Sequence, residues 1–286
     1  MDAKKFLIFA ALPAVLAGLA HWGNCALELH GYTIAGSRLP KGFDGYRIAH
    51  ISDLHNARMG KDNEKLIGLL RKAKPHMIAI TGDLIDSRST NVEIALGFAR
   101  EAVKIAPCYY VTGNHEARVN AYGELKAGLL AAGVTVLEDE AVEIHKEGET
   151  IVLMGVQDPR FQTGHGFGDA KAVIRAALAG LCKDGETFTI LLSHRPELFA
   201  AYAEQGIDLV LSGHAHGGQL RIPFLGGVVA PNQGLFPEFD AGLYTHGRTN
   251  MLVSRGIGNS VFPLRVNNRP EVLLVELKSG EQNIPI

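Results

Sequence analysis

The residues of this chain best suited to metal chemistry include two histidines, His214 and His216, separated by a single residue. They follow the apolar run 208–211 and precede two glycines. This order predicts a buried strand that leaves the core into a loop and holds both imidazoles in one open pocket. Side chains so spaced can diverge enough to serve two adjacent metal ions. A His-x-His pair alone is a weak signal, so its weight depends on the rest of the chain.

Carboxylate, amide and imidazole side chains recur directly after apolar runs earlier in the sequence. The seven candidate ligands are Asp53, His55, Asp83, Asn114, His194, His214 and His216. Hard or borderline divalent metals take oxygen and nitrogen donors of these types. Asp83 could bridge two ions, because a shared carboxylate screens the repulsion between cations about 3.5–4 Å apart. The recurrence at successive strand ends favours a two-metal site, whereas His50, within a predicted strand, is expected to be a core histidine.

Predicted strands and helices alternate in the first half of the chain. Strands are expected at 46–52, 77–81 and 108–112, and helices at 63–74, 91–106 and 121–133. This alternation is typical of βαβ units. Ligand sites in such sheets lie beyond the carboxyl ends of the strands, which is where the candidate ligands of this half fall.

The second half changes pattern. The runs 141–144 and 150–156 predict an antiparallel hairpin. Further strands are expected at 134–137, 188–192, 208–211, 251–254 and 271–277, helices at 169–181 and 197–206, and irregular segments at 28–45, 158–168 and 221–244. No linker divides the chain, so the sequence predicts one layered α/β body with two sheets.

The composition narrows the function classes. The net charge of -2 gives no sign of a nucleic-acid-binding surface. The three cysteines form no C-x-x-C, which argues against a disulfide framework and a thiolate metal site.

The first 27 residues differ from the rest. Lys4 and Lys5 precede the stretch 6–20, which contains no charged residue. As a helix this stretch would span about 22 Å, and apolar character continues to Leu27, with Trp22 where an interfacial aromatic would lie. A cleavable signal peptide fits as well. We therefore expect a membrane anchor or signal segment at 1–27, followed by a domain at 28–286. The lysine pair favours an extracytoplasmic domain, anchored to the cell membrane or exported after cleavage.

The order of motifs, D-x-H, G-D-x-x-D, G-N-H-E, a single histidine after a strand and G-H-x-H, resembles the calcineurin-like metallophosphoesterases from about Tyr46 to Leu277. The segments 52–56, 213–219, 241–244 and 253–258 are similar to the bacterial phosphodiesterase branch, which typically carries an export signal or membrane anchor. The resemblance implies a four-layer αββα sandwich of two mixed sheets.

The resemblance also implies roles for individual residues. The first metal site would comprise Asp53, His55, Asp83 and His216, and the second Asp83, Asn114, His194 and His214. His115 would hydrogen-bond the scissile phosphate and help protonate the departing oxygen, with Asp86 as its orienting carboxylate. Ser87 stands where Ser/Thr protein phosphatases carry arginine, and Asp86 where purple acid phosphatases carry tyrosine, so neither activity is favoured.

These features predict a dinuclear phosphoesterase that hydrolyses phosphodiesters by attack of a metal-bridging hydroxide. Mn²⁺, Fe²⁺, Zn²⁺ and Co²⁺ all accept this donor set. Arg195, next to His194, is a candidate phosphate clamp. The alternatives are a phosphomonoesterase or pyrophosphatase acting on a phospholipid or lipid-linked substrate, and a non-catalytic metal-binding module. The N-terminal segment and the apolar loop 222–229 make a lipid-linked phosphoester a plausible substrate.

Overall fold

The computed structural model describes residues 18, 22–164, 169–182, 185–259 and 262–280. Two six-stranded sheets form the centre of the described chain. In spatial order, the first sheet contains β1 (Glu28–Gly36), β16 (Glu271–Ser279), β2 (Arg47–Ile51), β3 (Met77–Thr81), β4 (Cys108–Val111) and β5 (Thr135–Val136). The second contains β14 (Gly242–His246), β15 (Thr249–Val253), β9 (Leu209–Ser212), β8 (Thr189–Leu192), β7 (Glu149–Gly155) and β6 (Glu140–Lys146).

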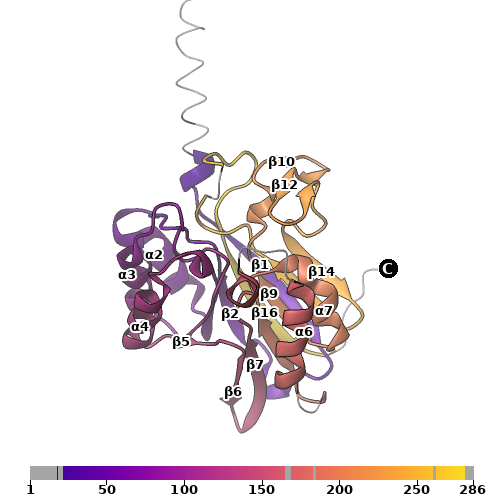
Figure 1. Cartoon of the computed structure of the whole chain (residues 1–286). Coiled ribbons are helices and arrows are strands. Elements are labelled where there is room, and N and C mark those ends of the chain that lie inside the picture. Colours follow the sequence, from indigo (N-terminus) through magenta and orange to yellow (C-terminus); the bar gives the residue numbers. More distant parts are fainter. Residues whose placement is uncertain (1–17, 19–21, 165–168, 183–184, 260–261, 281–286) are drawn as a thin grey trace, which may run out of the picture.

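Helices cover the outer face of each sheet. The first sheet packs against α2 (Glu64–Ala73), α3 (Val92–Ala102) and α4 (Tyr122–Ala132), and the second against α6 (Ala170–Leu181) and α7 (Phe199–Glu204). Figure 1 shows these two groups of helices on opposite sides of the strands. The short helix α5 (Arg160–Thr163) lies in the segment expected to be irregular.

Three apolar clusters separate the four layers, and strand periodicity determines which residue enters which cluster. In β2, Ile48 points between the sheets, whereas Ala49 and Ile51 face the helices of the first sheet. In β9, Leu209 and Leu211 point between the sheets, and Val210 faces the helices of the second. Successive side chains of a strand point to opposite faces, so strands buried on both faces are apolar throughout. The architecture is the αββα sandwich that the resemblance implies.

Two predicted connections were wrong. The segment 28–45 contains β1, which pairs in parallel with β16 over nine residues. The segment 221–244 contains the start of β14, an antiparallel partner of β15. The same segment contains two short hairpins, β10 (Arg221–Ile222) with β11 (Gly226–Gly227), and β12 (Val229–Ala230) with β13 (Gly234–Leu235). Edge strands and short hairpins bury few side chains, so their apolar pattern is weak.

Most of the predicted N-terminal segment lies outside the described residues. Within the part of the chain that the structure describes, no helix is long and apolar enough to cross a bilayer.

Candidate metal centre

The seven candidate ligands all follow strands whose carboxyl ends meet at one edge of the sandwich. Those of the first sheet come after β2, β3 and β4, which are neighbours in parallel. Those of the second come after β8 and β9, also parallel neighbours. Both sheets therefore contribute to one site, and all seven side chains are buried, with at most 6% of any residue exposed.

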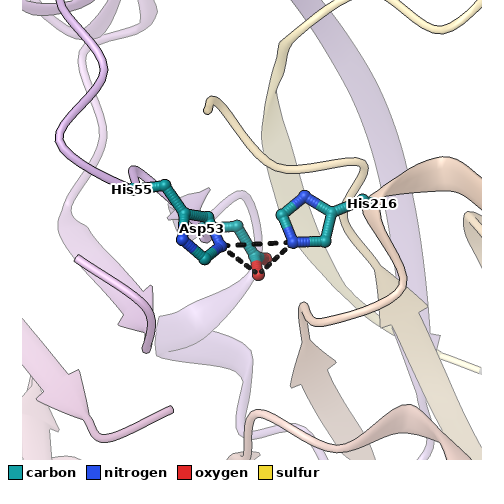
Figure 2. A group of neighbouring side chains, drawn as sticks. All are labelled: Asp53, His55 and His216. Atoms are coloured by element: carbon teal, nitrogen blue, oxygen red, sulfur yellow. Dashed lines mark hydrogen bonds and ion pairs between the residues drawn. The ribbon is translucent and has the colours of Figure 1, made fainter. Parts of the chain in front are cut away.

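Asp53, His55 and His216 form the first group, shown in Figure 2. His216 Nε2 lies 3.2 Å from His55 Nε2 and 3.3 Å from Asp53 Oδ1. His55 Nε2 lies 3.7 Å from the same oxygen. Donor atoms bound about 2.0–2.2 Å from one ion are roughly 3–3.5 Å apart. The group therefore has the spacing of ligands around a shared cation.

Asp83, His194 and His214 form the second group. His194 Nε2 lies 3.2 Å from Asp83 Oδ2 and 3.1 Å from His214 Nδ1. Asp83 Oδ2 also lies 3.5 Å from His55 Nε2 of the first group. The two groups are thus in contact through Asp83, the residue that the resemblance implies for both metal sites.

Asn114 supplies a further oxygen. Its Oδ1 is buried and accepts no hydrogen bond from the residues that the structure describes. A buried polar atom without a partner is costly. An amide oxygen in a pocket of carboxylates and imidazoles suits a divalent cation, so the donor set fits the metal pair that the sequence predicts.

The backbone at this centre is strained. Five of the seven candidates, Asp53, His55, Asp83, His214 and His216, have φ between 44° and 68°. Non-glycine residues seldom adopt this left-handed conformation, and such strain is concentrated at functional sites. Hydrogen bonds hold the carboxylates in place, since Asp53 Oδ2 accepts from the His214 amide (3.0 Å) and Asp83 Oδ1 from the His115 amide (2.8 Å).

Gly213 is required where the two sheets approach each other at the site. A Cβ atom at this position would lie 1.8 Å from Ser52 Oγ and 2.4 Å from Asp53 Oδ2. The glycine of G-H-x-H therefore allows the loop of His214 to pack directly on the loop of Asp53.

The protonation states favour cation binding at most of these ligands. Burial alone would raise the pKa of Asp53 and Asp83, but neighbouring imidazoles hold both pKa values below the ordinary range. Burial lowers the pKa of His216 to about 3 and that of His214 well below its usual value. Both carboxylates are thus charged and both imidazoles neutral, which are the states that bind metals.

His194 differs. Burial would lower its pKa, but the charge and hydrogen bond of Asp83, with Asp53 and Asp158, raise the pKa to about 10. Its Nδ1 lies 2.7 Å from the carbonyl oxygen of Thr81 and donates to it, which leaves Nε2 directed at Asp83. This second bond fixes the ring so that Nε2 is the donor presented to the second group.

His115 lies beside both groups, with Nε2 4.0 Å from Asp83 Oδ2. The Ser87 amide lies 3.0 Å from His115 Nδ1. An amide can only donate, so Nδ1 accepts and the neutral ring carries its proton on Nε2. Burial lowers the pKa of His115 to about 4, which favours this neutral form.

Asp86 is close to His115 without a hydrogen bond to it, since Oδ1 lies 3.6 Å from Nδ1. The carboxylate instead accepts from Nε and the amide of Arg88, at 3.0 and 2.8 Å. Ser87, which the sequence marks only as a departure from phosphatases, makes the contact expected of Asp86. The orienting role of Asp86 stays a prediction.

Arg195 is buried at the edge of the second group, where its Nη1 lies 3.3 Å from His214 Nε2. Its guanidinium donates to both carboxylate oxygens of Asp158 and to Glu197. Asp158 was not expected here, because no spacing in the sequence relates it to Arg195. The phosphate-clamp role of Arg195 stays a prediction.

Glu116 connects two of the loops that carry the candidate ligands. Its carboxylate accepts from the amides of Asp83 (2.9 Å) and Gly113 (2.8 Å), and so joins the two loops. Burial and the nearby Asp83 raise the pKa of Glu116 to about 7. The residue stands in the G-N-H-E motif, and that position was the only signal for it in the sequence. His50, by contrast, is a core histidine as predicted, with Nε2 2.8 Å from Thr81 Oγ1.

The comparison with known families decides the membership of the chain. The family model described as calcineurin-like phosphoesterase matches residues 46–218, more than half of the sequence. The chain belongs to this family. It is therefore a metal-dependent phosphoester hydrolase by family, with His/Asp clusters able to bind the metals.

Individual relatives agree with this membership. The metallophosphoesterase YkuE of Bacillus subtilis is 29% identical over 293 residues, covering 98% of each chain. Phosphodiesterase YaeI of Escherichia coli is 29% identical over 242 residues, covering 81% of this chain and 82% of YaeI. A transmembrane protein with metallophosphoesterase domain from Bos taurus is 31% identical, and the match covers 85% of this chain and 55% of that protein.

Among solved structures, TT1561 of Thermus thermophilus has the same fold. Its TM-score is 0.51 at 14% identity, over 74% of this chain and 90% of that one.

Proposed function

We propose that this chain hydrolyses phosphodiester bonds at two divalent ions held by the seven predicted ligands. The observation that carries the proposal is the contact of Asp83 Oδ2 with imidazoles of both ligand groups, at 3.5 and 3.2 Å. Asp53, His55 and His216 would hold one ion, Asn114, His194 and His214 the other, and Asp83 would belong to both. Because Asp83 contacts both ligand groups, the arrangement supports one reaction centre for two ions and not two separate structural ions.

Two bound divalent ions supply a hydroxide nucleophile near neutral pH and stabilise charge on the phosphoryl oxygens. The residues of the chain supply the rest. His115 presents Nε2–H beside Asp83, because the Ser87 amide occupies Nδ1. In this position the neutral His115 donates a hydrogen bond from Nε2–H to the phosphoryl group and the departing oxygen as negative charge develops on them. The proton that finally neutralises the departing oxygen comes from water.

The preference for diesters is supported by the likeness to phosphodiesterase YaeI and by Ser87 at the position of the protein-phosphatase arginine. A monoester carries one more negative charge than a diester. Arg195, whose Nη1 contacts His214 of the second group, is already paired with Asp158. This pairing leaves Arg195 little charge to offer the extra phosphate charge of a monoester.

We also propose that the N-terminal segment attaches the protein to the cell membrane with its catalytic domain outside the cytoplasm. The lysines at positions 4 and 5, the uncharged stretch that follows and the likeness to a transmembrane relative support this location. Resistance of the protein to alkaline extraction from membranes, with digestion by protease added to spheroplasts, is the expected result. Release at alkaline pH, or protection from the protease, would contradict it.

The activity is tested with the full chain in mild detergent, stripped by chelator and reloaded with Mn²⁺. A bis-aryl phosphodiester and the matching aryl monoester are compared at equal concentration. We expect metal-dependent hydrolysis with a higher kcat/KM for the diester. Faster cleavage of the monoester would support a phosphomonoesterase. No cleavage by a folded protein that binds two ions would support a non-catalytic module.

A further inference from the structure

Exposed apolar side chains are concentrated in one part of the described surface. We call residues 220–236 and 262–266 the apolar lobe. Nine of the thirteen exposed large hydrophobic side chains belong to it. Phe224, Leu225, Leu235 and Phe236 are each more than 60% exposed. Contiguous exposed apolar surface of this kind marks a contact with a protein or a membrane.

The lobe is an ordered structure. Leu220 forms a parallel bridge with Val266, and the Arg221 amide donates to the Val266 carbonyl at 3.0 Å. The amide of Phe236 donates to Val228 at 2.8 Å, which closes the second hairpin.

Phe224 and Phe236 adopt φ of 70° and 52°, a conformation unfavourable for a bulky side chain. Neither exposure to water nor backbone preference favours phenylalanine at positions 224 and 236. A contact between these exposed rings and an apolar partner surface would account for them.

The N-terminal segment leads directly to this lobe. Asn24 Nδ2 donates to the Pro263 carbonyl (2.8 Å), and Asn24 Oδ1 accepts from the Arg265 amide (3.0 Å). Trp22 lies under the guanidinium of Arg269, 4.4 Å from it. In Figure 1 the described end of this segment lies at the same end of the molecule as β10 and β12. The described residues 22–24, which follow the uncharged stretch in the sequence, therefore lie beside the lobe.

The sequence around the lobe is basic, but its arginines are buried or paired with carboxylates. The sequence 220–236 and 259–269 contains three arginines and no acidic residue. Arg265 is buried, Arg221 pairs with Asp240 and Arg269 with Glu28, so the exposed face of the lobe is mainly apolar. An apolar face of this kind favours the interfacial region of a bilayer.

We infer that the apolar lobe is a membrane-docking surface, which enters the interfacial region of a bilayer beside the N-terminal segment. The alternative, in which the stretch 6–20 packs on the lobe and shields it from water, is less favourable. The stretch has no polar face, so packing on the lobe would leave its other side in water. A bilayer can bury the lobe and the uncharged stretch together.

Docking in this way places the metal centre next to the lipid surface. His216 is four residues from Leu220, and Asn268 Nδ2 donates to the carbonyls of His216 (2.7 Å) and Gln219 (3.0 Å). On the other side, Asn232 of the second hairpin donates to Glu197 at 2.9 Å. If the proposed function holds, the substrate class is a phosphoester carried by a membrane lipid.

The docking is tested in the full chain, reconstituted into vesicles in which about one fifth of the lipid is anionic. Leu225→Cys carries an environment-sensitive fluorophore, and Leu130→Cys on α4, 51% exposed, carries the same label as a matched control. Cys25 and Cys182 are replaced by serine, and buried Cys108 is kept. We expect nitroxide-bearing lipid to quench the label at 225 at least threefold more than the label at 130, and aqueous iodide to show the reverse order.

Two results would overturn the inference. Equal quenching of both labels by iodide, with no lipid quenching, would show that the lobe remains in water. Protection of position 225 from both quenchers would show that protein covers it, either the N-terminal stretch or a second copy of the chain. Neither result would affect phosphoester hydrolysis, so the docking and the proposed function can fail separately.

Discussion

Asp83 is the residue through which the two ligand groups touch, and it carries the negative charge that both ions would share. We expect Asp83→Asn to lower bound metal from two ions to one or none and to reduce kcat by more than about 10³-fold, because the amide is neutral and bridges poorly. Metal analysis together with turnover checks this. Full activity with two ions bound would exclude Asp83 as the bridge.

His115 is predicted to act on the phosphoryl group without holding a metal. His115→Ala should lower kcat by about 10²–10³-fold, the usual cost of removing one hydrogen-bond donor to developing negative charge, while the metal content stays unchanged. Ser87→Ala is the matched control, since it keeps the backbone amide that fixes the His115 ring, and we expect less than about a threefold effect. Loss of metal from His115→Ala would instead make His115 a ligand.

At this scale the sequence predicted which side chains come together in the buried centre, because each follows an apolar strand at a motif spacing. It could not identify their partners. The pairing of Asp158 with Arg195 joins positions 37 residues apart, and only the packing of two loops creates it. The left-handed backbone at Asp53 and His214 could not be predicted either, because aspartate and histidine have no strong preference for that conformation.

Among the structural elements, the loop after β9 depends most on a single small residue. Gly213→Ala should destabilise the fold by about 1–3 kcal/mol through overpacking and weaken metal binding, because the added methyl displaces Ser52 and Asp53. Gly180→Ala in α6 meets no atom within 4 Å and should stabilise by about 0.5–1 kcal/mol. Thermal unfolding of both variants measures the contrast, and equal behaviour would refute the close approach.

Strand β2 contains a buried titratable group, His50, away from the ligand atoms. Burial lowers its pKa from 6.5 to about 3. Between these values the unfolded chain binds a proton that the folded chain does not. The free energy of unfolding should therefore fall as pH decreases from 6.5 toward 3, by up to about 1.4 kcal/mol per pH unit from this group. His50→Gln should show a shallower decline in urea titrations across this range, and an identical slope would argue against a neutral buried imidazole.

The sequence predicted the buried elements closely and the exposed ones poorly. The expected strand 77–81 coincides with β3, where every residue is buried. In β1, only Ile34 is fully buried among nine residues, so the strand lacks the apolar run that marks a core strand. Asn91 begins the expected helix 91–106 and, as an asparagine, would be expected to cap it. It does precede α3, but its side chain makes no capping bond.

For the whole molecule, the two-sheet body followed from alternating strands and helices, whereas the layer order came from the family resemblance. What the sequence alone could not supply was the meeting of β8 and β9 with β2 to β4 at one edge. That meeting results from the apolar layer between the sheets, to which Ile48, Val111 and Leu211 contribute. It brings residues more than 160 positions apart within contact, as for Asp53 and His214.

The central claim is that the seven ligands form one reaction centre for two ions. The most direct measurement is a titration of chelator-stripped full chain with Mn²⁺, following diester hydrolysis and bound metal together. We predict that activity rises to a plateau at two ions per chain and that the bound pair shows magnetic coupling by electron paramagnetic resonance. Full activity at one ion per chain, or two ions without coupling, would contradict the account.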